Sequence, residues 1–332
     1  MCLLKEKIRV ALIYKSNYKF LTGNHFDNTT YYFFMHALKR NKNLDVTYHQ
    51  SENYFDCAKL KNKADIILLP MNNTDGTPDV LDNIHELDIP VISRTGDPHW
   101  ANRYNQFQFH EKWNIDYYFN FMHESYFHKF YPKNYNYKKI TFGLEPNLYR
   151  EINHRYDNRI KNKILNSGAI GKTNLKSRLA NKILNPKRSG WYFYKLRTKC
   201  NNLDYIIHTK NIPKTNTDYT YAQILSQYFA SIAATTFYPT IKYWEVPASG
   251  CLTFMEITEL NRGTYLGFKD GENAIFINEK NYEKKFLDYL NDPHNTKWIE
   301  IAKAGKIFAD KNFNNDHATE DLVSLMIEIL KK

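Results

Sequence analysis

Short apolar runs recur along this chain, and segments with helical spacing separate most of them. Because parallel strands need long crossover connections, which helices usually supply, this alternation is typical of a parallel α/β sheet. A segment at 29–39 has helical spacing, and one at 78–87 begins with proline, which favours a helix start. In the first half the apolar runs lie at 7–14, 44–48, 64–70, 89–93 and 115–121.

The second half repeats this arrangement. Buried strands are predicted at 163–168, 203–208, 229–235 and 251–255. Helices are predicted at 175–184, 219–228, 282–290, 296–310 and 319–332, the last of them amphipathic. The sequence therefore predicts an α/β protein with two parallel sheets.

The bulk properties of the chain exclude several classes of protein. Its 332 residues are enough for two domains, and 42% hydrophobic with 24% charged residues is ordinary for a folded soluble chain. No window approaches the length of a transmembrane helix, and charges interrupt the N-terminal segment, which also lacks a small-residue cleavage site. Four widely spaced cysteines argue against a disulfide scaffold or a zinc site. We therefore expect a cytoplasmic protein.

Positive charge is concentrated in one segment. Between Glu151 and Lys214 the sequence holds 15 Lys or Arg against three acids, while the whole chain has a formal net charge of +11. A block of this kind favours an anionic partner, although long basic side chains also serve simply as a solvated helical face. The anionic partners that we expect are a diphosphate, DNA, or an anionic membrane surface, the last of which would make the protein peripheral at the membrane.

The stretch 242–271 carries the clearest motif. It reads KYWEVPASGCLTFMEITELNRGTYLGFKDG, and in it Glu245 is followed by the small residues Ser249 and Gly250 and then by an apolar run. Small residues after an acid suit a helix that must lie close to a bound ligand. The pattern E-V-P-A-S-G, an apolar strand and G-F-K-D-G-E-N resembles the donor-site region of GT-B glycosyltransferases, and most closely the group-1 and spore-maturation-protein-like members.

The resemblance gives Glu245 a role. In that family a Glu before a small-residue turn binds the ribose of the sugar nucleotide. Glu245 stands where the second Glu of the family's paired-glutamate motif would stand, but the first would fall at position 237, where this chain has Phe237. This departure bears on whether a retaining mechanism of the paired-glutamate type applies. A purely structural Glu245, capping or pairing within its helix, is the alternative.

The resemblance also implies a fold and an activity. It implies two Rossmann-like domains facing across a cleft, with an acceptor-side domain at 1–150 that ends in a Gly-Leu-Glu-Pro turn, and a nucleotide-sugar domain at 151–312. The helix at 313–332 often packs back on the first domain in this family. The implied activity is transfer of a hexose from a nucleoside-diphosphate sugar to a hydroxyl of a glycan, a lipid-linked or a nucleic-acid-borne acceptor. A sugar-nucleotide epimerase of this architecture, and a catalytically inactive binding protein, are the alternatives.

The donor should bind around a glycine turn in the second domain. Backbone N–H groups at such a turn and the dipole of the following helix favour phosphate, and nearby cations add charge where no metal is bound. Position 166 is Asn, which excludes a P-loop. Tyr221 is expected to stack on the base, or else to be an ordinary packed tyrosine. The expected donor-binding residues are Gly168, Gly171, Lys172, Arg178, Tyr221, Lys242, Glu245, Ser249 and Gly250.

The catalytic base should come from the first domain, because open α/β sheets bind ligands at the carboxyl ends of their strands. The loop after 89–93 holds Asp97 and His99, and the loop after the first strand holds His25. An acid and a histidine at a strand end suit proton abstraction from a sugar hydroxyl, so we expect Asp97 first, His99 second and His25 third. No histidine pair has the spacing of a helical zinc motif, and we expect neither a protein-bound metal nor a cofactor.

Overall fold

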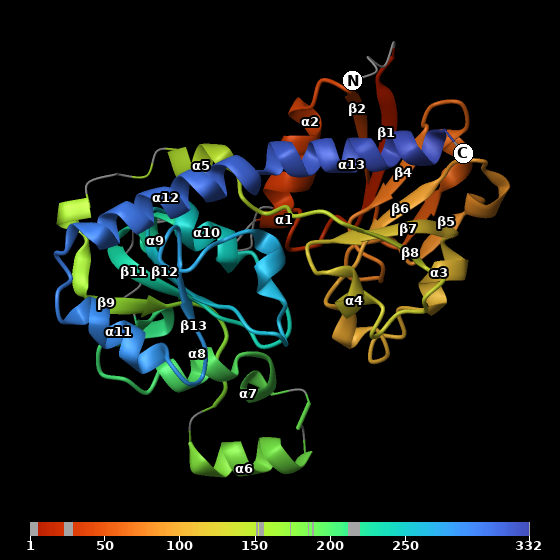
Figure 1. Ribbon diagram of the computed structural model, residues 1–332. Coiled ribbons are helices and arrows are strands. Elements are labelled where there is room, and N and C mark those ends of the chain that lie inside the picture. The colour runs from red at the N-terminus through yellow and green to blue at the C-terminus, as the bar shows by residue number, and fades with distance from the viewer. Residues whose placement is uncertain are drawn as a thin grey trace. The chain divides into compact units, whose positions relative to one another are not determined.

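The computed structural model describes residues 6–22, 29–150, 152, 156–172, 174–184, 186–187, 189–211 and 220–331. It contains two compact units (Figure 1). The first unit comprises Met1–Glu145 together with Phe313–Lys332, and the second comprises Pro146–Asn312. Each unit holds a parallel sheet with helices, as the alternating sequence pattern predicts.

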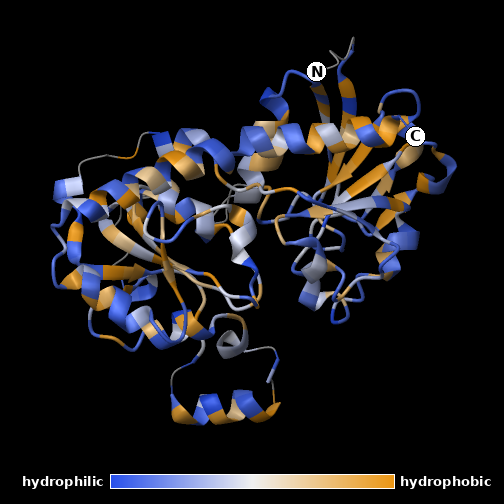
Figure 2. Cartoon of the chain, in the orientation of Figure 1, coloured by the Kyte–Doolittle hydropathy of each residue, from blue (hydrophilic) through white to orange (hydrophobic). Residues whose placement is uncertain are grey.

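The first unit is built on a six-stranded parallel sheet in the order β2-β1-β4-β6-β7-β8. Its central strands are buried on both faces, which explains their continuous apolar runs (Figure 2). The strands are β1 (Ile8–Tyr14), β2 (Leu44–Gln50), β4 (Ile66–Leu69), β6 (Val91–Arg94), β7 (Ile115–Asn120) and β8 (Asn136–Lys139). A separate pair joins β3 (Tyr54–Asp56) to β5 (Val80–Asp82).

The helices that connect the strands of the first unit are short. The predicted helix at 29–39 is present as α1 (Thr29–Tyr31), a π-helical turn (Tyr32–Ala37) and α2 (Leu38–Arg40). The predicted helix at 78–87 is wrong, because this segment forms β5 and a 3₁₀ turn at Ile84–Glu86. Helices that the sequence did not indicate are α3 (Gln108–Lys112) and α4 (Glu124–Phe127).

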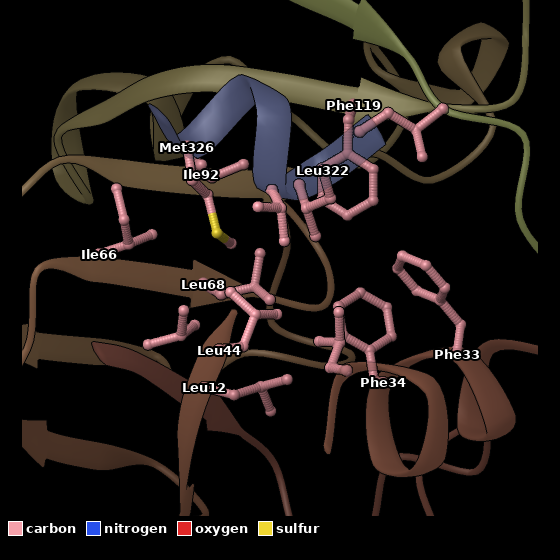
Figure 3. Packing of buried hydrophobic residues seen from close by; sticks show 14 of the residues in the cluster. Leu12, Phe33, Phe34, Leu44, Ile66, Leu68, Ile92, Phe119, Leu322 and Met326 are labelled. Atoms are coloured by element: carbon pink, nitrogen blue, oxygen red, sulfur yellow. The ribbon is translucent and has the colours of Figure 1, made fainter. Parts of the chain in front are cut away.

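The last helix, α13 (Asn315–Leu330), belongs to the first unit. Its Leu322 and Met326 are fully buried in the same core as Leu12 and Phe34, from β1 and the π-helical turn (Figure 3). The amphipathic pattern at the C-terminus is therefore explained by packing against the sheet of the N-terminal segment.

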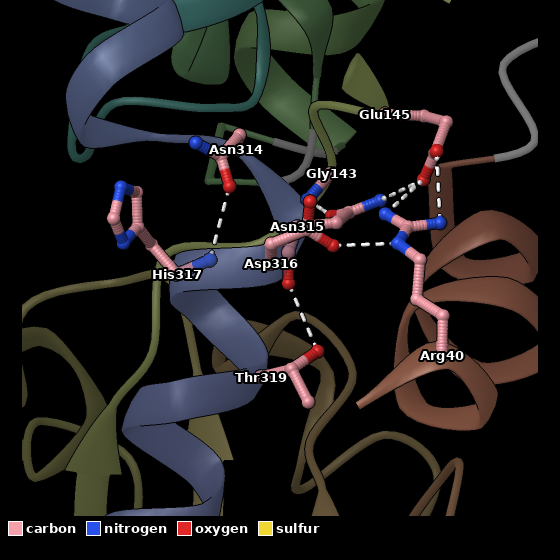
Figure 4. Close-up of polar contacts among 8 residues, drawn as sticks. All are labelled: Arg40, Gly143, Glu145, Asn314, Asn315, Asp316, His317 and Thr319. Carbon is pink, nitrogen blue, oxygen red and sulfur yellow. Dashed lines mark hydrogen bonds and ion pairs between the residues drawn. The ribbon is translucent and has the colours of Figure 1, made fainter. Parts of the chain in front are cut away.

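Polar contacts hold the start of α13 in place (Figure 4). Asn315 accepts a 2.8 Å hydrogen bond from the Gly143 N–H and donates one of 3.2 Å to Glu145. Glu145, which is buried, also pairs with Arg40 over 3.0 Å, and Arg40 donates to Asp316 over 2.6 Å. The acid of the Gly-Leu-Glu-Pro turn thus links α2 to α13, which are far apart in sequence.

The second unit has a five-stranded parallel sheet in the order β10-β9-β11-β12-β13. Its strands are β9 (Ile160–Asn166), β10 (Ile206–His208), β11 (Tyr228–Ala233), β12 (Leu252–Glu256) and β13 (Ile275–Ile277). Its helices are α5 (Pro146–Arg150), α6 (Leu175–Leu184), α7 (Gly190–Phe193), α8 (Lys195–Cys200), α9 (Tyr221–Ser226), α10 (Lys242–Ala248), α11 (Tyr282–Leu290) and α12 (Thr296–Asn312). None of the described helices in either unit combines the length and apolar character that crossing a bilayer would require.

Candidate functional site

The carboxyl ends of the second sheet bring polar residues together. Strand β9 ends at Asn166, β10 at His208 and β12 at Glu256, and because the strands are parallel these ends share one edge. Ligands of open α/β sheets bind at this edge, where loops and helix starts present polar groups. The candidate donor site is therefore built from the segments that follow these strands.

Gly168 lies at the centre of this site. Its φ of +89° is in the left-handed region, which a residue with a side chain rarely adopts. A Cβ added at Gly168 would stand 2.7 Å from Lys242 Cε, 3.4 Å from Lys242 Nζ and 3.3 Å from Arg197 Nη1. Two cationic groups therefore lie close to the backbone of the β9 loop, and a side chain at this position would have to displace the end of Lys242.

Arg197, in α8, is the most unusual of these cations. Only 2% of the residue is exposed, and its Nε is buried with no acceptor among the residues that the structure describes. Its guanidinium stacks on the Tyr194 ring, 4.3 Å from the centroid. Burial lowers the pKa of Arg197, but arginine keeps its proton in proteins. A buried charge without a full set of hydrogen bonds is costly, so this site is suited to receiving an anion.

Lys242, in the first turn of α10, is fixed beside Arg197 by Tyr221. Its Nζ donates a 3.0 Å hydrogen bond to the Tyr221 hydroxyl and lies 4.5 Å from the centroid of that ring. The Tyr221 hydroxyl also contacts Ser167 Oγ at 2.5 Å. The Tyr221 ring is buried and engaged in these contacts, which fits the packed tyrosine of the two alternatives.

His208 contacts the Gly168 turn and is affected by the positive charges around it. Its Nε2 lies 2.9 Å from the Gly168 carbonyl. Burial lowers the pKa of His208, against the opposing effect of the Gly168 carbonyl, and the charges of Lys210, Arg197 and Lys242 lower it further. At neutral pH a neutral imidazole can donate to that carbonyl and so hold the Gly168 turn in its conformation.

Glu245 lies three residues after Lys242, on the same face of α10. Only 2% of it is exposed, and its charge acts on Tyr221, raising the pKa of that phenol after the larger effect of burial. The carboxylate is thus at the site but almost closed from solvent. A ribose reaches it only if neighbouring side chains move.

Glu256 is a second buried acid at this edge, at the end of β12. It is 5% exposed, and its Oε2 has no hydrogen-bond partner among the described residues. Burial, and then the charge of Glu279, raise the pKa of Glu256 to about 8, while the positive charge of Arg197 opposes this. The carboxyl is therefore largely protonated at neutral pH and does not neutralise Arg197 fully.

Three more predicted donor residues follow Gly168 along the chain. Gly171 packs against Trp191, and its N–H donates to Thr198 over 2.8 Å. Lys172 is exposed, and its carbonyl accepts from the Trp191 indole. Arg178 lies on α6 and stacks on Trp191 at 4.5 Å. Helix α6 projects from the rest of the second unit (Figure 1), so Lys172 and Arg178 belong to the segment that carries it, here called the α6 hairpin. Gly171 lies at the base of this hairpin, bonded to the neighbour of Arg197 in α8.

Two more predicted residues lie at the other edge of the sheet. Ser249 and Gly250 precede β12 and so stand at its amino end, where Arg159 donates to the Ser249 carbonyl over 3.0 Å. The Ser249 hydroxyl is used within the unit, donating to the Val246 carbonyl at 2.6 Å. Because α10 separates them from Lys242, these residues are structural neighbours of Arg159 and not part of the cluster at Gly168.

The first unit places two of the three predicted base residues together. Asp97 is exposed and precedes a 3₁₀ turn at Pro98–Trp100, which holds the half-buried His99. Burial lowers the pKa of His99, against the opposing charge of Asp97, so the imidazole is neutral at pH 7 and able to accept a proton. His99 Nδ1 lies 3.3 Å from the Tyr126 hydroxyl. His25 lies outside the described residues.

A pocket of about 420 Å³ lies at the carboxyl ends of β1 and β4 in the first unit. Lys15 stands at its edge and is held by the Thr74 carbonyl and Asp79, each at 2.9 Å. Its other lining residues are Asn17, Tyr18, Lys19, Phe20, Met71 and Asp75. A cavity of this size and mixed polarity suits a small polar acceptor group.

Sequence reasoning missed Arg197 and Glu256. Arg197 stands between Lys195 and Lys199 in the basic segment and looks like surface charge, but its neighbours Leu196 and Thr198 are buried with it. Glu256 had a usable signal, since an acid directly after an apolar strand lies at the edge where ligands bind. In the part of the chain that the structure describes, no three His, Cys, Asp or Glu residues gather as a metal-binding group.

Comparisons with solved structures identify the architecture. An alpha-glucosyltransferase in complex with UDP-glucose and DNA containing an abasic site matches with a TM-score of 0.56 and 9% identity, over 97% of this chain and 100% of that one. A glycosyltransferase from Rickettsia africae ESF-5 matches with a TM-score of 0.54 and 14% identity, over 98% and 99%. Anabaena HepE in complex with UDP and glucose matches with a TM-score of 0.53 and 9% identity, over 97% and 100%.

Comparison by sequence adds no relative: neither a family model nor a curated protein matches this chain. At these levels of identity the structural likeness shows the fold alone. The chain therefore has the GT-B fold, with two Rossmann-like domains.

Proposed function

We propose that this protein is a glycosyltransferase that moves a sugar from a nucleoside-diphosphate sugar to a hydroxyl acceptor. The observation that carries the proposal is the buried guanidinium of Arg197 beside Gly168 and Lys242. Two cations around a glycine turn at the carboxyl edge of a parallel sheet suit a diphosphate. The fold supports the same function, since the matched structures include complexes with UDP-glucose and with UDP and glucose.

In this proposal the second unit stabilises the leaving group. As the bond from the anomeric carbon to the phosphate oxygen breaks, negative charge accumulates on the diphosphate. Arg197 offers planar N–H donors for two phosphate oxygens, and Lys242 adds a point charge. Tyr194 and Tyr221 already hold the two cations, so these side chains need little reorganisation when the charge develops. Arg197 is as buried as Glu245, so the diphosphate reaches it only after neighbouring side chains move. After local side-chain movement, the Glu245 carboxylate accepts hydrogen bonds from the ribose hydroxyls.

The first unit supplies the acceptor side. His99 takes the proton from the acceptor hydroxyl as that oxygen attacks the anomeric carbon, and Asp97 stabilises the imidazolium that results. This order reverses the ranking of the two residues made from the sequence, because Asp97 is exposed whereas His99 is half-buried and neutral. No cofactor is part of this proposal. We also propose that, among GT-B glycosyltransferases, this protein is related to the group-1 and spore-maturation-protein-like members.

A catalytically inactive nucleotide-sugar-binding protein is the second candidate. The observation that favours it is Phe237, which replaces the first Glu of the paired motif and packs on Tyr192 at 4.5 Å and on Phe193 at 5.9 Å. A ring in such a cluster makes no hydrogen bond to a sugar. The absence of this Glu bears on the stereochemical course of the reaction and on whether the site catalyses transfer at all.

Turnover assays with a panel of UDP-, GDP- and TDP-sugars separate the two candidates. We expect one donor to be converted slowly to its nucleoside diphosphate without added acceptor, since water replaces the hydroxyl. Binding of a donor without release of nucleoside diphosphate, with or without candidate acceptors, would favour the inactive binding protein. Failure of every donor and every free nucleoside diphosphate to bind would contradict both.

A further inference from the structure

Helix α6 leaves its apolar side exposed. The four large aliphatic side chains of this ten-residue helix are Leu175, Leu179, Ile183 and Leu184, and they are 83%, 61%, 69% and 75% exposed. Leu175, Leu179 and Ile183 recur every four residues and so form one stripe along the helix. Figure 2 shows alternating apolar and polar colour on this helix. A stripe of this size on a soluble chain marks an interaction surface.

The charge around the stripe is of one sign. Lys176 lies on one side of the stripe, and Arg178 and Lys182 lie on the other. The sequence contains no acid between Asp157 and Asp204, so nothing on this segment offsets these cations. A helix with an apolar stripe between rows of basic residues is the pattern of helices that lie in the plane of an anionic bilayer surface.

The hairpin that carries α6 is firmly joined to the second unit. Gly171 and Gly190 are in close contact, since a Cβ on Gly190 would stand 2.7 Å from the Gly171 nitrogen. Trp191 donates from its indole N–H to the Lys172 carbonyl over 2.7 Å, and its ring lies 4.5 Å from the Arg178 guanidinium. The base of the hairpin therefore joins α6 to the unit, and Leu175 and Leu179 of the stripe line one side of a groove whose other side includes Trp191.

We propose that α6 binds the surface of an anionic membrane, with Leu175, Leu179 and Ile183 inserted among the acyl chains. Lys176 and Lys182 then contact lipid phosphates. A nucleic acid would use the cations but would offer no apolar medium for the stripe, so the lipid surface accounts for both observations. This inference is independent of the proposed enzymatic activity, because vesicle binding is measured without any donor.

Vesicle flotation of the full chain tests the proposal. Vesicles of phosphatidylcholine alone and of phosphatidylcholine mixed with phosphatidylglycerol are compared at low and at physiological salt. We expect binding to the anionic vesicles, weaker binding at higher salt, and at least about tenfold weaker binding to the neutral vesicles. Changing Leu175, Leu179 and Ile183 together to Ser should also reduce binding about tenfold, and K176E with K182E should do the same.

Matched variants control for general effects. Leu260, Leu287 and Ile307 are exposed aliphatic residues elsewhere in the second unit, and replacing these three with Ser should leave flotation unchanged. Lys280 and Lys284 are exposed and serve as the charge control, as K280E with K284E. Because all these side chains are at the surface, circular dichroism and melting temperature should match those of the unchanged protein.

Three outcomes would overturn the proposal. The first is no flotation with anionic vesicles, or flotation that the α6 variants do not reduce. The second is binding of duplex DNA that the two charge reversals abolish and the Ser substitutions leave intact, which would assign the surface to nucleic acid. The third is self-association that the Ser substitutions abolish in the absence of lipid, which would assign it to a second copy of the chain.

Discussion

The Lys242 ammonium donates a 3.0 Å hydrogen bond to the Tyr221 hydroxyl, joining the first turns of two helices that follow different strands. This contact fixes the Lys242 side chain across Gly168, where Arg197 approaches from a third helix. The donor site proposed here thus depends on three segments that are widely separated in sequence.

Gly168→Ala should block the donor site. The substitution forces a side chain into a φ of +89° and places a methyl group between Arg197 and Lys242. We expect a loss of about 1–2 kcal/mol in stability from the backbone and at least about tenfold weaker binding of UDP. Gly271→Ala is the matched control, because Gly271 has a φ of +75° with nothing near its Cβ position. Equal UDP affinities in the two variants would contradict the placement of the diphosphate.

Glu245→Gln tests the ribose contact separately from the diphosphate contact. If the carboxylate accepts hydrogen bonds from the ribose hydroxyls, UDP should bind about tenfold more weakly to this variant, because hydrogen bonds to a charged group are lost. Inorganic pyrophosphate, which has no ribose, should bind as it does to the unchanged protein. Calorimetry with both ligands measures this. A parallel loss for UDP and pyrophosphate would show that Glu245 acts on the cations instead.

The proposed base, His99 of the first unit, should determine the rate of turnover and its dependence on pH. His99→Gln removes the proton acceptor, so kcat should fall about 10²–10⁴-fold while the affinity for donor is kept. Asp97→Asn should lower kcat less and should move the acid limb of the profile to lower pH, because the charge of Asp97 raises the pKa of His99. Full activity of His99→Gln would show that another group is the base.

Glu256 should make stability fall as pH rises. Its pKa in the folded protein, about 8, lies above its ordinary value of 4.5, so between these values the folded state holds a proton that the unfolded state has lost. Stability from this group is therefore complete below pH 4.5 and is lost as pH rises toward 8, by at most about 1.4 kcal/mol per pH unit. Denaturant unfolding at pH 6, 7 and 8 measures this slope.

Glu256→Gln should remove that dependence on pH. Glu272→Gln is the control, since Glu272 is an exposed acid that pairs with Lys269 and is not among the charges that act on Glu256. If Glu256→Gln and the unchanged protein keep the same slope between pH 6 and 8, Glu256 is ionised in the folded state, and it then neutralises Arg197.

The sequence predicted the fold better than the site. Apolar runs identify buried parallel strands directly, and α6 lies at 175–184, as its spacing indicates. The segment 78–87 misled because its proline suggested a helix start, whereas tertiary pairing with β3 draws Val80–Asp82 into a strand. Local patterns predict elements, but pairing across the chain decides between competing ones.

For the site, sequence distance was the wrong guide. Lys172 and Arg178 follow Gly168 closely, yet they belong to the α6 hairpin, while Arg197 reaches Gly168 from 29 positions further on. Ser249 and Gly250 lie near Glu245 in sequence, but α10 carries them to the amino edge of the sheet. Arg197 is buried because of the packing around α8. Counting charges along the sequence cannot show which cation of a basic segment is buried.

Titration of UDP into the unchanged protein and into Arg197→Met tests the central claim most directly. Methionine keeps the volume of the buried side chain but removes its charge, so UDP should bind about 10–150-fold more weakly while the melting temperature stays the same or rises. Arg178→Met is the matched control and should bind UDP normally. Unchanged UDP affinity in Arg197→Met, together with a lowered melting temperature, would show that Arg197 is a structural residue and that no diphosphate binds there.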